Sequence, residues 1–305
     1  MFTNIKHILD DAAQNYYGVI AGNAINMETA KGLITAAHEE NAPLILIIGQ
    51  GQMTRHANAE LMVPMIKTLA SKTPAPIALC LDHGTEFERI AHAFRHGFSS
   101  IMIDASAQTM EENIVRTKRV VELCHPQGVP VEGELGHVGM AAQGDGQDES
   151  LYTKPEDAVR FVRETGVDCL AIACGTAHGK YPEGYVPKIN FDLIRAVKEA
   201  TGGMPLALHG SSGSGDENIR LAVKAGINKI NVATEILTAC WNRLNELRSW
   251  ETMTTMDPFV QMEDAAKEMA RHWIRLAGSS GKADHFKPDY TFGDPVAKTY
   301  NLQGE

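Results

Sequence analysis

Short apolar runs recur along the chain at intervals of roughly 25 to 40 residues, and each is followed by a stretch with helical periodicity. Alternation of this kind predicts parallel strands joined by helical crossovers. The runs that we expect to form strands are Val19–Ala24, Leu44–Gly49, Ile77–Leu81, Ser100–Asp104, Val129–Leu135, Cys169–Cys174, Pro205–His209 and Lys229–Val232. Eight strands suggest closure, so we predict the α/β class and a (β/α)8 TIM barrel with an additional C-terminal helix and an extended tail.

Helices are expected between and after these strands, at Glu28–Glu40, Ala59–Ser71, Glu86–Arg95, Glu111–Cys124, Pro155–Thr165, Phe191–Thr201, Asp216–Lys224 and Glu235–Leu247. A barrel of this kind takes roughly 250 residues plus appended helices, so one domain over residues 1–283 accounts for the pattern. Residues 284–305 show no clear period and are expected to form the tail. The polar loop Gly136–Ser150 is unusually long, and is either a mobile lid or a surface excursion.

Charge and apolar patterning exclude several classes of protein. The formal net charge of -10, without a basic cluster, argues against nucleic-acid binding, and no apolar run is long enough to cross a bilayer. The opening of the chain carries charge where a signal peptide needs an apolar core, and the five cysteines form no CxxC pair. We therefore expect a cytoplasmic protein with no nucleic-acid or membrane partner.

Titratable and amide side chains stand where the expected strands end. Because the active site of a (β/α) barrel lies at the carboxyl ends of its strands, these groups are expected to meet at one mouth. They are Asp82 and His83, Asp104, Glu132 and Glu134, His178, His209 and Asn231.

Three of these groups are histidines on different strands: His83, His178 and His209. Three imidazoles can bind a zinc-like ion and leave one position open for a substrate oxygen, as catalytic zinc sites do. Any single histidine is more often a surface or core group. His38, His92, His96 and His125 fall in helical patterns and are interpreted as surface groups.

Two loops have the composition of a phosphate site. His209-Gly210-Ser211-Ser212-Gly213-Ser214-Gly215 leaves the seventh strand and enters a helix, and Asn231-Val232-Ala233-Thr234 ends the eighth. Glycines let backbone amides approach an anion, and hydroxyls and a helix start add donors. A mere turn is the alternative, but the loops after these two strands are the usual phosphate position of a barrel.

With these residues identified, the chain resembles the class II fructose-bisphosphate and tagatose-bisphosphate aldolase family. The resemblance runs to about Ala283 and rests on six ordered motifs: Leu81-Asp82-His83-Gly84, Ser100-Ile101-Met102-Ile103-Asp104, Val131-Glu132-Gly133-Glu134-Leu135-Gly136, Gly175-Thr176-Ala177-His178-Gly179-Lys180-Tyr181, Leu208-His209-Gly210-Ser211-Ser212-Gly213 and Asn231-Val232-Ala233-Thr234-Glu235.

The resemblance implies that His83, His178 and His209 bind Zn2+ or another divalent metal, and that Asp82 moves the proton at the C4 hydroxyl. It also implies a site for the C1 phosphate of the ketose, with a monovalent cation, Na+ or K+, nearby. The predicted phosphate and substrate residues are Asn23, Gly179, Gly210, Ser211, Ser212, Asn231, Ala233 and Thr234.

The chemistry agrees with these roles. Breaking a carbon bond next to a ketone leaves an enediolate, whose charge a cation stabilises as a Lewis acid. Asp82 then needs only to accept the hydroxyl proton as general base, although it is alternatively a partner that orients His83. Asp104 and Glu134 are interpreted as such orienting groups or as alternative metal contacts.

One departure from the family bears on the substrate. Many relatives have Asp-Pro-Arg before the last helix, where the arginine reaches a neighbouring subunit's site and grips the second phosphate. This chain has Asp257-Pro258-Phe259. A phenyl ring cannot replace a guanidinium on phosphate, so we expect a ketose 1-phosphate without a distal phosphate, formed reversibly from dihydroxyacetone phosphate and an aldehyde.

Other functions remain open at this stage. They are a fructose or tagatose 1,6-bisphosphate aldolase proper, a metal-dependent sugar-phosphate isomerase or epimerase, and a Schiff-base aldolase using Lys229 or Lys180. A sugar-phosphate binding protein without catalysis is the alternative outside the enzymes. The family is oligomeric, so a homodimer or homotetramer is expected.

Overall fold

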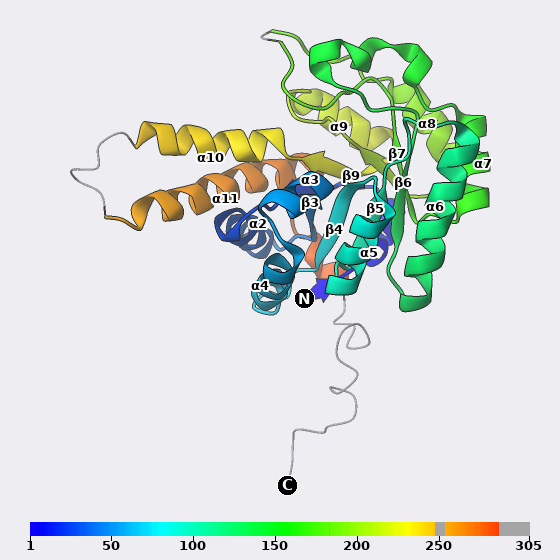
Figure 1. Ribbon diagram of the computed structural model, residues 1–305. Helices are drawn as coiled ribbons and strands as arrows, with labels where there is room; N and C mark the ends of the chain where they lie inside the picture. Colours follow the sequence, from blue (N-terminus) through cyan, green and yellow to red (C-terminus); the bar gives the residue numbers. More distant parts are fainter. Residues whose placement is uncertain (183, 248–253, 287–305) are drawn as a thin grey trace.

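The computed structural model describes residues 1–182, 184–247 and 254–286 (Figure 1). Its strands pair in parallel in one sheet of order β1-β4-β3-β2-β9-β8-β7-β6-β5, and β4 also pairs with β5. Strands β2 to β9 therefore form a closed barrel, which confirms the predicted fold. The strands are β1 (Phe2–Thr3), β2 (Val19–Asn23), β3 (Leu44–Gly49), β4 (Ile77–Gly84), β5 (Ser100–Ile103), β6 (Val131–Leu135), β7 (Cys169–Ile172), β8 (Leu206–Leu208) and β9 (Ile227–Val232).

Helices surround this barrel (Figure 1). In the described part of the chain, none has the length and apolar character needed to cross a membrane. The helices are α1 (Ile5–Gln14), α2 (Met27–Glu39), α3 (Gln50–Arg55), α4 (Ala59–Ala70), α5 (Phe87–His96), α6 (Met110–Cys124), α7 (Pro155–Thr165), α8 (Phe191–Ala200), α9 (Asp216–Ala225), α10 (Thr234–Glu246) and α11 (Asp257–Ala277).

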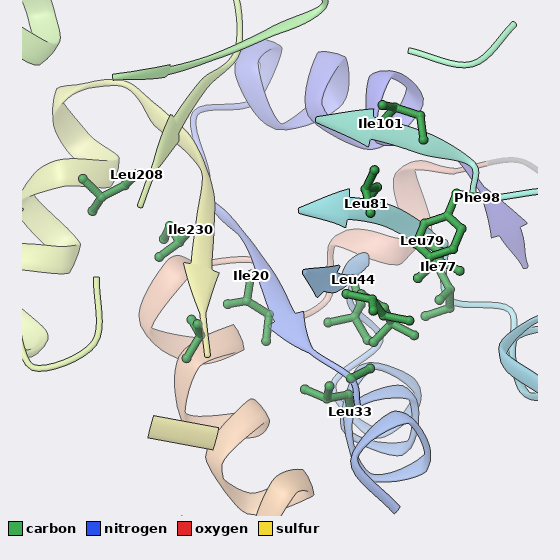
Figure 2. Close-up of a cluster of buried hydrophobic side chains, with 14 of the residues drawn as sticks. Ile20, Leu33, Leu44, Ile77, Leu79, Leu81, Phe98, Ile101, Leu208 and Ile230 are labelled. Carbon is green, nitrogen blue, oxygen red and sulfur yellow. The ribbon is translucent and has the colours of Figure 1, made fainter. Parts of the chain in front are cut away.

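The apolar core has two layers, because successive side chains of a strand point to opposite faces. Ile20 of β2 and Ile230 of β9 point outward and meet helix residues such as Leu33 of α2 (Figure 2). The neighbouring Val19 and Ala21 belong to a separate cluster inside the barrel. This alternation gives each strand one face for the helices and one for the barrel interior.

Helix α1 closes one end of the barrel interior. Its side chains Ile5, Ile8 and Leu9 are fully buried and belong to the same cluster as the inward-facing strand residues. The expected helices did not include α1 or the short α3. The preceding strand β1 pairs with the start of β4, so the N-terminus is tied to the barrel.

The predicted division into a domain (1–283) and a tail (284–305) stays a prediction. A short 3-10 turn, Lys282–His285, crosses the proposed boundary, and Phe286 stacks edge-on against His7 with ring centroids 5.2 Å apart. The rest of the tail, from residue 287 on, lies outside the described residues.

Helices α10 and α11 lie side by side and project away from the barrel as an arm (Figure 1). Helix α11 is the predicted additional C-terminal helix, and its barrel-proximal part packs closely on α2. A side chain at Gly32 of α2 would clash with the carbonyl oxygen of Glu263, so glycine permits this close approach.

Glu40, at the end of α2, ties that helix to α11. Its Oε1 accepts hydrogen bonds from Arg275 Nη2 at 2.7 Å and Arg271 Nε at 3.0 Å, and its Oε2 accepts one from Ser280 Oγ at 2.7 Å. The Arg275 guanidinium, despite the opposing effect of burial, holds the pKa of Glu40 at about 2, below its ordinary 4.5. Because the folded-state pKa is the lower one, the carboxylate stabilises the fold above pH 4.5 and loses this effect as the pH falls toward about 2.

We predict that Glu40→Gln lowers the free energy of unfolding at pH 7 by about 1.5–3 kcal/mol, because charged hydrogen bonds are lost at a buried position. The difference from wild type should shrink between pH 4.5 and about 2. Urea unfolding across this pH range measures both effects. The matched control is Glu268→Gln, whose carboxylate pairs with Arg243 at the surface and should matter by less than about 1 kcal/mol. Equal losses in the two variants would contradict the prediction.

Candidate active site

Three histidines from different strand ends meet at the mouth of the barrel. His83 Nε2 lies 3.0 Å from His209 Nδ1, and the ring of His178 stands edge-on to that of His83 with centroids 4.7 Å apart. One ring nitrogen of each histidine lies within 4.8 Å of the other two. The structure therefore brings together the three side chains that the sequence predicted as one group.

A local irregularity in β4 positions both Asp82 and His83. Adjacent residues of a regular strand point to opposite faces, yet these two line the same cavity. The backbone of His83 has φ +46°, a left-handed conformation rare outside glycine, and the register with β5 shifts between Leu81 and Gly84. This break in the strand turns both side chains to the barrel mouth.

Carboxylates orient two of the rings, each through one ring nitrogen. His83 Nδ1 lies 2.8 Å from Asp104 Oδ2, and His209 Nε2 lies 2.9 Å from Glu132 Oε1. In the usual design of a metal site, a carboxylate on the far nitrogen fixes the ring so that its other nitrogen faces the ion. His178 Nε2 is buried and has no hydrogen-bond partner in the described part of the chain. A buried nitrogen without a partner, beside two oriented rings, fits a divalent ion with nitrogen ligands.

The surroundings shift the pKa values of His83 and His178 in opposite directions. Burial lowers the pKa of His83, but the carboxylates of Asp82, Asp104 and Glu134 outweigh it and raise the pKa to about 10. Burial and the neighbouring histidines lower the pKa of His178 to about 3. Burial, together with the charge of Asp104, raises the pKa of Glu134 to about 8.

Asp82 is not the partner that orients His83, because Asp104 occupies that position. Asp82 Oδ1 instead accepts a hydrogen bond from Asn231 Nδ2 at 2.8 Å. Burial favours the neutral acid, but the charges of His83, His209 and Lys229 keep the pKa of Asp82 below its ordinary value. Asp82 is therefore ionised at neutral pH and able to accept a proton.

The most deeply buried charges of the site are those of Glu132, which was expected at the mouth, and of Lys229, which the sequence offered only as the nucleophile of a Schiff-base alternative. Lys229 Nζ lies 2.8 Å from Glu132 Oε2 and 2.7 Å from Asn231 Oδ1, and both charged side chains are fully buried. Burial alone would lower the pKa of Lys229, but Glu132 raises it above its ordinary range. A lysine held in its charged form is a poor nucleophile, and the exposed Lys180 does not line the cavity, so neither supports a Schiff-base mechanism.

A small cavity of about 70 Å³ opens at this mouth. Its lining consists of Ile47 and ten residues singled out from the sequence: Asp82, His83, His178, Gly179, Gly210, Ser211, Ser212, Asn231, Ala233 and Thr234. Asn23 is not among the lining residues. Its side-chain amide pairs with that of Gln52: Asn23 Nδ2 donates to Gln52 Oε1 at 2.8 Å, and Gln52 Nε2 donates to Asn23 Oδ1 at 2.9 Å. The role of Asn23 in substrate binding therefore stays a prediction.

The two predicted phosphate loops lie next to each other in the cavity wall. Gly210 has φ +64°, and a side chain there would meet the backbone of Ala177 at 2.5 Å, so the His209 and His178 segments approach closely only with glycine. Glu235 in the first turn of α10 accepts a hydrogen bond of 2.7 Å from the amide of Gly213. This contact joins the glycine-serine loop to the amino end of α10, where amides and the helix dipole favour an anion.

The loop Gly136–Ser150 packs against the segment that carries His178 instead of projecting freely. His178 donates its backbone N–H to Gly139 at 2.7 Å and accepts one from Ala141 at 2.9 Å. Movement of this loop as a lid stays a prediction. The loop nevertheless lies directly beside one of the three histidines.

The fold and the site define a class of protein, namely (β/α)8-barrel enzymes with a three-histidine group able to hold a divalent ion. The model of the family described as fructose-bisphosphate aldolase class-II matches residues 3–282. YdjI of Escherichia coli K12 is 38% identical over 93% of this chain and 100% of its own, and a fructose-bisphosphate aldolase of Geobacillus stearothermophilus is 36% identical over 92% and 98%. The crystal structure of the YdjI aldolase superimposes with a TM-score of 0.83, covering 93% of this chain and 100% of that chain, at 36% identity.

The chain belongs to the class II fructose-bisphosphate aldolase family. It is an aldolase, a carbon–carbon lyase of a family that generally depends on a divalent metal and acts on sugar phosphates. These findings confirm the family and the enzyme class predicted from the sequence.

We predict that Lys229→Met lowers the free energy of unfolding by about 3–5 kcal/mol, because Glu132 would remain buried without its counter-charge. Replacing both members, Lys229→Met with Glu132→Leu, should cost less than the single change, since no unpaired charge remains. Denaturant unfolding of the single and double variants measures the difference. Lys6→Ala, at an exposed pair with Asp10, is the control and should cost less than about 1 kcal/mol. A loss of unfolding free energy below about 1 kcal/mol for Lys229→Met would disprove the role of the buried pair.

Proposed function

We propose that the protein is a metal-dependent aldolase that reversibly cleaves a ketose 1-phosphate into dihydroxyacetone phosphate and an aldehyde. The observation that carries this proposal is the convergence of His83, His178 and His209 on one cavity that Asp82 also lines. In this proposal the three histidines hold the ion, for which Zn2+ suits the nitrogen donors. When bound, the ion acts as a Lewis acid that stabilises negative charge on substrate oxygens.

Asp82 is assigned the proton transfer at the C4 hydroxyl. In the cleavage direction its ionised carboxylate accepts the hydroxyl proton, the bond between C3 and C4 breaks, and the aldehyde departs. Carbon C3 of the three-carbon fragment then gains a proton from solvent, Asp82 releases to solvent the proton that it accepted, and the fragment leaves as dihydroxyacetone phosphate. In the synthetic direction Asp82 returns its proton to the aldehyde oxygen. The hydrogen bond from Asn231 supports this assignment, because it fixes the orientation of the carboxylate.

The C1 phosphate is assigned to the two loops at the end of β8 and β9. Gly210, Ser211, Ser212, Ala233 and Thr234 of these loops line the cavity, and the helix α10 begins there. With a formal net charge of -10, the protein as a whole repels an anionic substrate. Local donors at a helix start are the natural means of holding it, and a Na+ or K+ ion beside the phosphate belongs to the same proposal.

The catalytic and orienting carboxylates should be separable by mutation. Asp82→Asn should lower kcat by about 10²–10⁴-fold with zinc content unchanged, because it removes the proton acceptor and no ligand. Asp104→Asn should instead weaken zinc binding by about 10–100-fold, because it releases His83 Nδ1. Steady-state kinetics and zinc content after dialysis measure the two effects. Loss of zinc from Asp82→Asn, with turnover restored by added zinc, would refute the assignment of Asp82.

The substrate is proposed to lack a phosphate at its far end. Phe259 stands in the first turn of α11, where many relatives place an arginine, and half of its surface is exposed. A phenyl ring offers neither charge nor hydrogen bonds to a phosphate. The alternative is a fructose or tagatose 1,6-bisphosphate aldolase proper, which the names of several relatives support.

Kinetics over a panel of ketose 1-phosphates and bisphosphates tests this proposal. We predict that a singly phosphorylated ketose has the higher kcat/KM, and that Phe259→Arg shifts the ratio toward the bisphosphate by about tenfold or more, since charged hydrogen bonds contribute about 1.5–3 kcal/mol. Val260→Arg, one residue further along the exposed part of α11, is the matched control and should leave the ratio unchanged. Turnover of fructose 1,6-bisphosphate above that of every singly phosphorylated ketose would reject the proposal.

The protein is also proposed to be a homodimer or homotetramer. The arm formed by α10 and α11 exposes Trp241, Phe259 and Val260, as does Met256 directly before α11, each with at least 48% of its surface accessible. Apolar side chains gathered on one projecting element are typical of a surface that a second copy covers. The cytoplasmic location inferred from the sequence remains a prediction.

A further inference from the structure

A second group of metal-binding side chains lies on the outer ring of helices and shares no residue with the three-histidine group. His92 and His96 stand one turn apart on α5, and Glu60 reaches them from the first turn of the neighbouring α4. Glu60 Oε1 lies 3.3 Å from His92 Nε2 and 3.6 Å from His96 Nε2. The two imidazole rings are 4.5 Å apart between centroids.

The arrangement has the geometry of a chelate. Residues four apart on a helix share one face, so two histidines at this spacing present their nitrogens side by side. Here both Nε2 atoms point at one carboxylate oxygen, and one donor atom of each side chain lies within 4.8 Å of the other two. Two imidazoles and a carboxylate are a donor set that zinc, nickel and copper ions accept.

The three side chains are accessible from solvent. Their exposed fractions are 36% for His92, 25% for His96 and 51% for Glu60, so an ion can enter and water can complete its coordination. A hydrogen bond from its own backbone amide lowers the pKa of Glu60, which is therefore ionised at neutral pH. Arg95 also lies near Glu60, so the local charge is not purely negative.

We propose that His92, His96 and Glu60 form a surface site for a divalent transition-metal ion such as Zn2+. The ion links α4 to α5, two consecutive helices of the outer ring that pack on each other. Because the ion binds only when both helices are in place, its binding free energy adds to the stability of the fold. The site is distinct in function from the proposed catalytic group and has no part in turnover.

Zinc stoichiometry of the full-length protein tests this inference. Protein carrying one equivalent of Zn2+ is dialysed against increasing Zn2+, and bound metal is measured together with the melting temperature. Wild type should bind one equivalent more than the His92→Gln/His96→Gln variant, and only wild type should gain thermal stability from this second equivalent. The matched control is His125→Gln, at a histidine of similar exposure that pairs with the single carboxylate of Asp168. It should behave as wild type.

A second variant guards against an effect of misfolding. Glu60→Gln keeps the side-chain shape and should weaken binding of the second equivalent by about tenfold or more, since one ligand is lost. Aldolase turnover should be unchanged in all of these variants. Equal zinc stoichiometry in wild type and His92→Gln/His96→Gln, with both folded and active, would overturn the proposal and leave the cluster as an ion pair.

Discussion

The ion pair between Glu132 and Lys229 inside the barrel is the interaction on which the site depends. Both side chains are fully buried, and a charge removed from water must be paired and hydrogen-bonded. Each member of the pair also makes a hydrogen bond to a further group. Glu132 bonds to the ring of His209, and Lys229 donates to the side chain of Asn231. The Asn231 amide in turn donates to Asp82. One buried pair thus fixes both an imidazole proposed to hold the metal and the carboxylate proposed to move the proton.

The closed barrel explains why so many polar groups meet above this pair. All its strands run in parallel, so residues at the carboxyl ends of β4, β8 and β9 reach one mouth although they are distant in the chain. Regular strand geometry is insufficient, because Asp82 and His83 would then point to opposite faces. The left-handed backbone at His83 resolves this conflict, as strained conformations at functional sites commonly do. The network around the ring, which includes Asp104, holds that conformation in place.

Much of the site could be predicted from the sequence because residue type at a strand end is a strong signal. Ten of the residues that line the cavity were expected there, and only Ile47 was not. Asn23 shows the limit of this approach, since its amide turns to Gln52, a residue of α3 that no pattern predicted. The surface cluster shows another limit. The spacing of His92 and His96 is visible in the chain, but Glu60 comes from a different helix, and only packing brings it within 3.3 Å.

The sequence by itself determined the barrel, the family and the identity of the polar groups at its mouth, because periodicity and local motifs depend on neighbouring residues. Tertiary structure alone decided which groups pair. It placed Asp104 instead of Asp82 behind His83, and it paired Lys229 with Glu132, which removed the lysine as a nucleophile. The physical reason is that hydrogen bonds and charge interactions depend on distances across the barrel, and closure of the sheet sets those distances.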